Sequence, residues 1–295
     1  MNEKARAPDA LTVDVEEYFH ATIFADSIPR KEWDERAGRA SSSLARLLER
    51  FDAWGVRATF FFLGWYAERN PGAVRDVVTA GHEVAAHGYD HTLLPDLGPR
   101  RFREDLRRTK GLLEESGGAA VAGYRAPTFS ITDRTLWAIP ILAEEGFAYD
   151  SSVFPIRHDR YGIPGFPRRP VRLRFEGGSL VEFPLSTWRI GPWNVPVAGG
   201  GYLRLLPLPV MVRGLRAVRR EGAPAVLYLH PWEIDPGQPR IPLPLLSRIR
   251  HYRNLDRAED RLGRLLRDGS WAPMGEILRE LPLDDHPLRV SPALP

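Results

Sequence analysis

The run VRATFFFL at residues 56–63 is strongly apolar and predicts a buried β-strand. It lies between two amphipathic stretches that predict helices, one over 41–54 with Ser41 as its N-cap and one over 65–80. Apolar runs and helical stretches continue to alternate along the chain on both sides of it. This alternation predicts an α/β fold built on a parallel sheet.

The alternation is interrupted once, by a segment rich in Pro and Gly at about residues 155–206. We expect this segment to be an insertion that covers the sheet, with a hairpin of strands 171–175 and 180–183. Outside it, strands are expected at 11–15, 82–86, 121–124, 147–149 and 225–229, and helices at 99–115, 133–145, 208–220 and 255–267.

The composition excludes several classes of site and partner. The 295 residues include no cysteine, so disulfides, thiolate metal sites and cysteine nucleophiles are ruled out. The 41 basic and 38 acidic residues leave a net charge of only +3. Acidic residues and leucines at helical spacing interrupt the arginine-rich stretches 213–220 and 248–267, which is typical of solvated helix faces. We therefore expect no nucleic-acid partner.

The chain as given also shows no sign of crossing a membrane. Residues 1–9 are polar and contain no apolar signal-peptide core, and the longest apolar stretch, 58–67, has about half the length of a membrane span. We therefore expect no membrane span and a cytoplasmic location.

Three clusters of polar residues lie at or just past the ends of predicted strands, at the edge where the active sites of α/β barrels form. In the first, Asp14 and Glu16 lie two residues apart and so share one face of a strand. The second is His87-Gly88-Tyr89-Asp90-His91, whose two histidines have a spacing common in zinc sites. The third is His230. Taken singly, these clusters also fit an acidic turn, two surface histidines and a core histidine.

Together the clusters supply what metal-assisted hydrolysis needs. A site of two histidines and one carboxylate leaves metal positions open for water and substrate. A second carboxylate can then act as a general base, and a separate histidine can act as a general acid.

In this order and spacing the motifs resemble those of the polysaccharide deacetylase family (NodB homology, carbohydrate esterase family 4), in particular the branch associated with exosortase-linked exopolysaccharide clusters. The resemblance covers about residues 10–275. Besides the three clusters it is carried by Tyr124-Arg125-Ala126-Pro127, Tyr149-Asp150-Ser151-Ser152 and Leu229-His230-Pro231. It implies a distorted (β/α)7 barrel of the NodB type over 11–234, preceded by a tail at 1–10 and followed by a helical extension at 235–295 packed on the barrel.

The first motif departs from the family's usual pair of adjacent aspartates, of which the first is a base and the second a metal ligand. Val15 stands at the second position and cannot bind a metal. Because some relatives carry Asp-x-Asp or Asp-x-Glu instead, the resemblance assigns Asp14 as the base and Glu16 as the ligand. Glu17 is the alternative ligand.

The resemblance implies hydrolysis of N-acetyl groups on an amino-sugar-containing exopolysaccharide or its precursor. His87, His91 and Glu16 would hold a divalent ion, with Zn²⁺ favoured over Co²⁺, Ni²⁺ or Mn²⁺. Asp14 would deprotonate the attacking water, and His230 would protonate the departing amine.

The remaining motif residues have supporting roles in this scheme. Arg125 would pair with Asp14, and Asp150 would orient Arg125 or His230, although a buried structural ion pair would also explain Arg125 and Asp150. A backbone N–H near Thr128 would stabilise the oxyanion. Candidates for stacking on sugar rings are Tyr89, Phe129 and Trp232, with Trp188 and Trp193. The expected partners are an N-acetylated glycan and other proteins of the exopolysaccharide pathway.

Two alternatives rest on the same residues. A metal-independent, allantoinase-like amidase of the same fold would explain Val15, and metal content distinguishes it from the deacetylase. A catalytically silent glycan-binding protein is the other alternative, against which the presence of both Asp14 and His230 argues.

Overall fold

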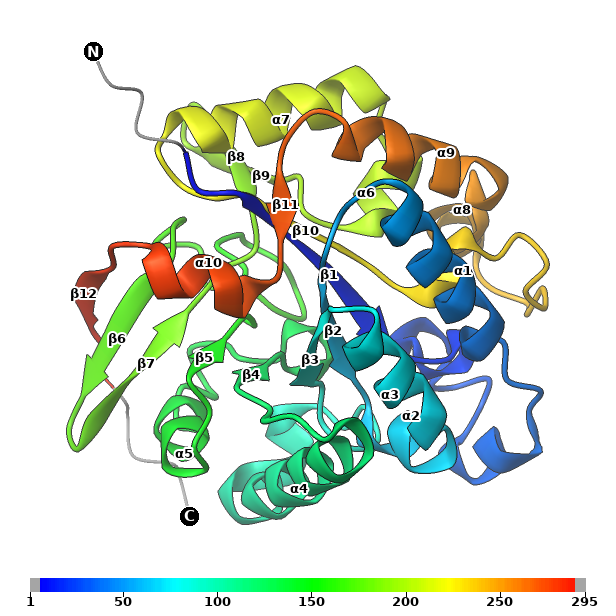
Figure 1. Cartoon of the computed structure of the whole chain (residues 1–295), viewed down its shortest axis with the longest axis horizontal. Helices are drawn as coiled ribbons and strands as arrows, with labels where there is room; N and C mark the ends of the chain where they lie inside the picture. The colour runs from blue at the N-terminus through cyan, green and yellow to red at the C-terminus, as the bar shows by residue number, and fades with distance from the viewer. Residues whose placement is uncertain (1–5, 290–295) are drawn as a thin grey trace.

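The computed structural model describes residues 6–289, which form a mostly parallel sheet with helices packed around it (Figure 1). Its strands are β1 (Asp9–Val15), β2 (Thr59–Phe62), β3 (Glu83–Ala86), β4 (Gly123–Tyr124), β5 (Tyr149–Asp150), β6 (Val171–Phe175), β7 (Gly178–Glu182), β10 (Val226–Leu229), β11 (Trp271–Ala272) and β12 (Asp284–Pro287). A separate hairpin consists of β8 (Thr187–Ile190) and β9 (Trp193–Pro196).

The main sheet follows the order β10-β1-β2-β3-β4-β5-β7-β6-β12, with β11 also paired to β1. Every pairing in it is parallel except that of β6 with β7. The predicted α/β fold is therefore confirmed. No pairing within residues 6–289 joins β10 to β12 and closes the sheet into a barrel.

Helices connect most of the parallel strands. The α-helices are α1 (Ala40–Ala53), α2 (Gly64–Arg69), α3 (Pro71–Thr79), α4 (Leu94–Gly117), α5 (Ala138–Glu144), α6 (Gly200–Leu205), α7 (Leu208–Arg220), α8 (Leu245–Tyr252), α9 (Leu255–Leu266) and α10 (Met274–Glu280). Short 3-10 helices are η1 (Tyr18–His20), η2 (Thr22–Phe24), η3 (Arg30–Glu35), η4 (Pro127–Phe129) and η5 (Pro231–Ile234).

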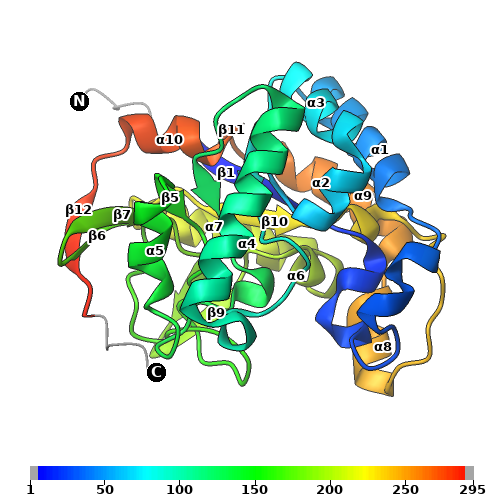
Figure 2. The same cartoon turned by 90° about the horizontal axis from the view of Figure 1, so that it is seen from below.

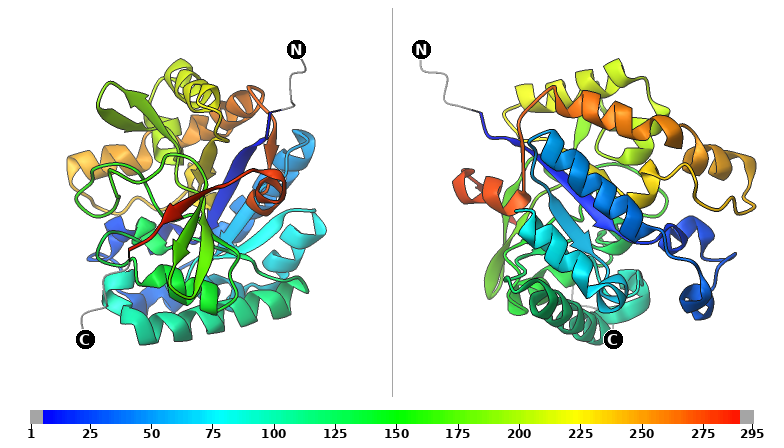
Figure 3. Two further views of the ribbon diagram at one scale, coloured as in Figure 1. Left: turned by 90° about the vertical axis from the view of Figure 1, so that its left-hand side faces the viewer. Right: turned by 45° about the vertical axis from the view of Figure 1, so that its right-hand side comes forward.

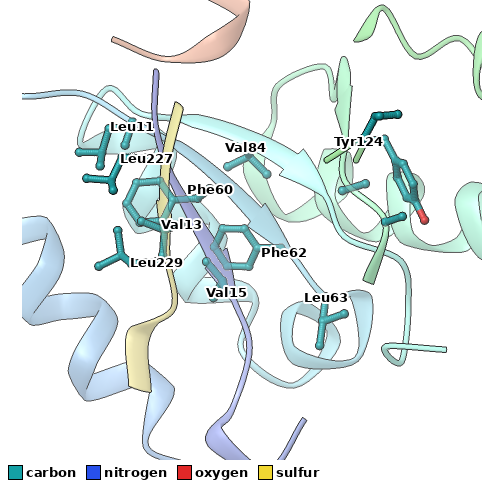
Figure 4. Close-up of a cluster of buried hydrophobic side chains, with 14 of the residues drawn as sticks. Leu11, Val13, Val15, Phe60, Phe62, Leu63, Val84, Tyr124, Leu227 and Leu229 are labelled. Atoms are coloured by element: carbon teal, nitrogen blue, oxygen red, sulfur yellow. The ribbon is translucent and has the colours of Figure 1, made fainter. Parts of the chain in front are cut away.

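Strand β1 lies between β10 and β2, and all seven of its residues are buried. Its odd-numbered residues Leu11, Val13 and Val15 enter the main apolar cluster, where they meet side chains of β2 and β10 (Figure 4). Each such fully buried side chain stabilises the fold by about 2 kcal/mol. The alternation of side chains along the strand directs Asp14 to the other face.

Several predicted elements differ from those observed. The helix predicted over 65–80 is two helices, since α2 ends at Arg69 and Pro71 begins α3 after the single residue Asn70. The helix predicted over 41–54 also has a different start. It is α1, which begins at Ala40, so Ser41 is not its N-cap. The predicted insertion supplies β6 and β7 to the main sheet, and the extension predicted as helical supplies β11 and β12.

Two ends of the predicted organisation lie outside the described residues, namely residues 1–5 of the N-terminal tail and residues 290–295 of the C-terminal extension. Among residues 6–289, no helix combines the length and the apolar character that a membrane crossing requires.

His82 makes the stability of the fold sensitive to acid. Its buried ring contacts Phe51 and Phe60, and its Nδ1 accepts a hydrogen bond from the N–H of Ala58 at 3.1 Å. Burial lowers the pKa of His82 from 6.5 to about 4. Because the folded-state pKa lies below the unfolded one, the contribution of neutral His82 is complete above pH 6.5 and is lost as the pH falls towards 4.

We expect wild-type protein to lose about 2 kcal/mol of unfolding free energy through His82 between neutral pH and about pH 4. His82→Gln keeps a hydrogen-bond acceptor but does not titrate, so its loss over the same range should be smaller by that amount. Urea unfolding of both proteins across this range measures the difference. Parallel pH dependences would show that His82 does not contribute.

Candidate metal and catalytic site

The carboxyl ends of neighbouring parallel strands bring the predicted site residues to one edge of the sheet. Asp14 lies near the end of β1 and Glu16 directly follows it, whereas His87 follows β3, Arg125 follows β4 and His230 follows β10. Except for Arg125, these side chains line a cavity of about 300 Å³. The structure therefore gathers residues that are more than 200 positions apart in the sequence.

Glu16, His87 and His91 present one ligand atom each to a common point, with these atoms within 4.8 Å of one another. Nε2 of His91 lies 3.1 Å from Oε2 of Glu16. Nδ1 of His87 lies 2.8 Å from the carbonyl oxygen of Arg125, so it carries the proton and leaves Nε2 free to bind a metal. The donor set, with His87 oriented by the carbonyl oxygen of Arg125, fits a divalent ion.

The electrostatics of these three residues also fit a cation. Burial raises the pKa of the Glu16 carboxyl to about 7, and its Oε2 is buried without a hydrogen-bond partner among residues 6–289. Burial lowers the pKa of His87 to about 4 and that of His91 well below its usual value, so both imidazoles are neutral. A bound cation would supply the positive charge that the buried carboxylate lacks.

The backbone of His91 supports the same interpretation. Its φ of 59° lies in the left-handed region, which is uncommon for a residue other than Gly. Such a conformation costs free energy and is found preferentially at functional sites.

The structure separates the two candidate carboxylate ligands. Glu16 faces the histidines, whereas both oxygens of Glu17 accept hydrogen bonds from backbone N–H groups at the start of α1. The distances are 2.7 Å to the nitrogen of Arg39 and 3.0 and 3.1 Å to that of Ala40. Glu17 is thus the cap of α1, and Glu16 is the candidate metal ligand.

Asp14, the predicted base, is held by Arg125. Nη1 of Arg125 donates to Oδ1 of Asp14 at 2.7 Å, and both side chains are buried. Oδ2 of Asp14 lies 4.0 Å from Nε2 of His230. The ion pair fixes one oxygen of the carboxylate and leaves the other on the side of His230.

Two residues that the sequence analysis did not predict, Glu233 and Arg204, support His230. Nδ1 of His230 lies 3.4 Å from Oε2 of Glu233, and Nη2 of Arg204 donates to Oε1 of Glu233 at 3.0 Å. The His230 ring also stacks on Trp232 at 4.7 Å between centroids. His230 is therefore held on one side by a carboxylate and on its face by an indole, while its Nε2 lies 3.6 Å from Oε1 of Glu16.

These contacts shift the pKa values of the pair in opposite directions. Burial opposes the charge of His230, but the hydrogen bond to Glu233 and the charges of Glu16, Glu233 and Asp14 raise the pKa of His230 to about 9. Burial alone would raise the pKa of Glu233, but the charges and hydrogen bonds of Arg204 and His230 outweigh it and lower this pKa to about 2. The pair is a charged imidazolium and carboxylate.

Two of the predicted site residues lie elsewhere. Asp150 accepts hydrogen bonds from Oγ and N of Ser152, and none from Arg125 or His230, so the prediction that it orients either residue by contact is wrong. Tyr89 does not line the cavity: its hydroxyl donates to Glu68, and the guanidinium of Arg108 covers its ring.

Other predicted residues do reach the cavity. Thr128, Phe129 and Trp232 line it, and Thr128 and Phe129 have left-handed φ values of 52° and 54°. Nε1 of Trp232 donates to Oε1 of Glu16 at 3.3 Å, so this indole also orients the candidate ligand. Trp188 and Trp193 are not part of the lining.

Comparison with known proteins divides the chain into two matched segments. Residues 30–143 match the family model described as "Polysaccharide deacetylase". These residues are therefore similar to polysaccharide deacetylases. Residues 151–279 match a second model, described as "Domain of unknown function (DUF3473)". The polysaccharide deacetylase segment contains His87, His91 and Arg125, whereas His230 and Glu233 lie in the second segment.

Curated relatives of this chain have related names. The chain is 34% identical over 136 residues to a peptidoglycan deacetylase-like protein, FGM2, of Gibberella zeae, covering 44% of this chain and 38% of the relative. It is 32% identical over 110 residues to a peptidoglycan deacetylase of Helicobacter pylori, covering 37% and 36%. The matches thus span less than half the length of these relatives.

Solved structures share the fold over nearly the whole chain. A Mycobacterium smegmatis structure titled "putative polysaccharide deacetylase" has a TM-score of 0.62 at 22% identity, covering 96% of this chain and 95% of that one. A CE4 family pseudoenzyme from Bacillus anthracis has a TM-score of 0.50 at 16% identity, covering 97% and 70%. These likenesses show the fold alone, so the chemistry must be argued from the residues of the site.

We expect Glu16→Gln to lower the affinity for Zn²⁺ by at least about 100-fold, because it removes the anionic member of the ligand set. Titration of metal-depleted protein with Zn²⁺ by calorimetry measures this change. Glu17→Gln is the matched control: it should keep the affinity and lower the unfolding free energy by about 1 kcal/mol through loss of the α1 cap. The reverse result for the two variants would make Glu17 the ligand.

Proposed function

We propose that this chain is a metal-dependent deacetylase that removes N-acetyl groups from an amino-sugar-containing exopolysaccharide or its precursor. The observation that carries the proposal is the placement of Asp14 and His230 beside Glu16, His87 and His91 in one cavity. The family match of residues 30–143 and the names of the curated relatives support it. A cytoplasmic location and contacts with other exopolysaccharide-pathway proteins belong to the same proposal.

Glu16, His87 and His91 would hold the metal, and Zn²⁺ fits their nitrogen and oxygen donors, as do Co²⁺, Ni²⁺ and Mn²⁺. When bound, a divalent ion would polarise the acetyl carbonyl and lower the pKa of the attacking water.

Asp14 is suited to accept the proton of that water. Its Oδ1 is occupied by Arg125 at 2.7 Å, so Oδ2 is the oxygen available for proton transfer. The paired guanidinium also keeps the carboxylate from rotating away from the cavity. A base fixed in this way can act without reorganisation.

His230 is suited to protonate the departing amine. Glu233 bonds its Nδ1 and thereby directs Nε2 towards Glu16 and Asp14, where the scissile amide would lie. Proton transfer from Nε2 to the amide nitrogen as the C–N bond breaks would give acetate and a free amine. Phe129 and Trp232, in the cavity lining, offer faces and edges for the attached sugar.

Release of acetate from N-acetylglucosamine oligomers and from an N-acetylated exopolysaccharide, by metal-depleted protein with and without added Zn²⁺, tests the proposal. We expect Zn²⁺-dependent release, and we expect Asp14→Asn to lower kcat by about 10²- to 10⁴-fold with little change in Zn²⁺ affinity. Release that does not depend on metal would favour the allantoinase-like amidase. Undiminished release by Asp14→Asn would exclude Asp14 as the base.

Glu233→Gln should lower kcat by about 10- to 100-fold with KM nearly unchanged, because His230 loses the carboxylate that orients and charges it. Steady-state acetate release measures both constants. Glu145→Gln is a control: Glu145 directly follows α5, pairs with Arg103 and Arg107 of α4 and does not line the cavity, so its replacement should not affect catalysis. An equal loss in both variants would point to a general effect on folding.

A further inference from the structure

Exposed apolar side chains are concentrated on two elements. Among residues 6–289, five of the six large exposed ones are Leu245, Leu246 and Ile249 on α8 and Ile190 and Trp193 at the turn of the β8–β9 hairpin. Leu246 is 70% exposed and Trp193 is 69% exposed. α8 and this hairpin extend towards the same side of the molecule (Figures 2 and 3). Apolar surface gathered in this way marks an interaction site.

Helix α8 is anchored on one face and bare on the other. His251 is buried between Trp232 and Phe24, with ring centroids 4.6 and 4.7 Å away, and its Nε2 lies 2.8 Å from Oε1 of Gln238. The two leucines of its first turn instead face outward. The packing of His251 thus fixes the direction in which the exposed leucines point.

The exposed leucines lie among arginines that have no carboxylate partner. Neither Arg248 nor Arg250 on α8, nor the flanking Arg240 and Arg253, lies within salt-bridge distance of an Asp or Glu of residues 6–289, and α8 contains no acidic residue. Arginines elsewhere are commonly paired; Arg219, for example, binds both Asp9 and Asp268. α8 therefore presents apolar and uncompensated positive groups together.

We propose that α8 and the tip of the β8–β9 hairpin dock the protein on an anionic lipid bilayer. Exposed leucines would enter the boundary of the acyl chains, and the guanidinium groups would bind lipid phosphates. Trp193 fits this boundary because an indole has an apolar body and a polar N–H. The arginines give the surface a charge complementary to an anionic membrane, and two separate apolar elements on one side suit a broad surface better than a narrow groove.

The docking surface adjoins the catalytic cavity. Arg250 and His251 of α8 are part of the cavity lining. A protein bound through α8 would therefore hold the cavity close to the lipid headgroups. In combination with the proposed function, on which this step rests, the substrate would be a glycan presented at a membrane surface, such as a lipid-linked precursor.

Co-sedimentation with vesicles tests the docking without any activity measurement. We expect binding to vesicles of phosphatidylcholine and phosphatidylglycerol, weakened by salt, and little binding to phosphatidylcholine alone. The double variant Leu245→Ser/Leu246→Ser should lower the partition coefficient by about 10-fold or more, and Trp193→Ser should lower it several-fold. Val210→Ser, which alters the remaining exposed apolar residue on α7, should leave binding unchanged.

Absence of binding by the wild type, or equal binding by the folded double variant, would overturn the proposal. The proposal would also be overturned if the wild type were a dimer, the double variant were a monomer, and both bound vesicles equally. The patch would then be a protein interface. Acetate release from soluble oligosaccharides should be unchanged in the double variant. Because that assay does not involve the vesicles, the proposed function and the docking can fail separately.

Discussion

The buried pair of Asp14 and Arg125 is the interaction on which the site depends. A guanidinium with no exposed surface must have its N–H groups paired, because an unpaired buried charge is very costly. Arg125 meets this requirement with Asp14 and Thr12 of β1 and with the carbonyl and hydroxyl oxygens of Ser151 beyond β5, while its cation lies 4.1 Å above the ring of Phe61. The position of the base is thus set by strands on both sides of β4.

The neighbouring carboxylates show how local geometry gives similar residues different roles. Asp14, Glu16 and Glu17 are nearly consecutive, yet they pair with Arg125, face the two histidines and cap α1, respectively. Because side chains alternate along β1, Asp14 and Glu16 point away from the apolar face of the strand. The third can cap α1 only because the chain turns through η1 to η3 before the helix begins.

The different roles of these carboxylates show which features of the site could be predicted from the sequence. Alternation along 11–15 and the spacing of His87 and His91 are local patterns, so the strand, its two faces and the histidine pair could be predicted from them. The choice between Glu16 and Glu17 required the position of α1, which is not a local property. Asp150 was mispredicted because its carboxyl is bound by Ser152, two residues along the chain, and by Glu182 of the paired strand β7, rather than by Arg125 or His230.

The residues that support His230, Glu233 and Arg204, could not be predicted from sequence patterns for a different reason. The spacing of His230 and Glu233 is visible, but Arg204, which holds Glu233, comes from α6, almost 30 residues earlier. No periodicity links a helix to a later 3-10 turn. Only the packing of α6 against β10 and of α9 against α6 and η5 shows that these residues form one unit.

The two matched segments meet at the central strand, and neither contains the whole site. β1 precedes both, with β2 on one side and β10 on the other. The parallel register that pairs Val13 with Leu229 carries His230 to the level of Asp14, so strand pairing aligns the proposed acid with the proposed base. The segment of unknown function also contributes Arg204, Glu233 and α8. It therefore supplies both the support of the acid and the surface that would bring the cavity to its substrate.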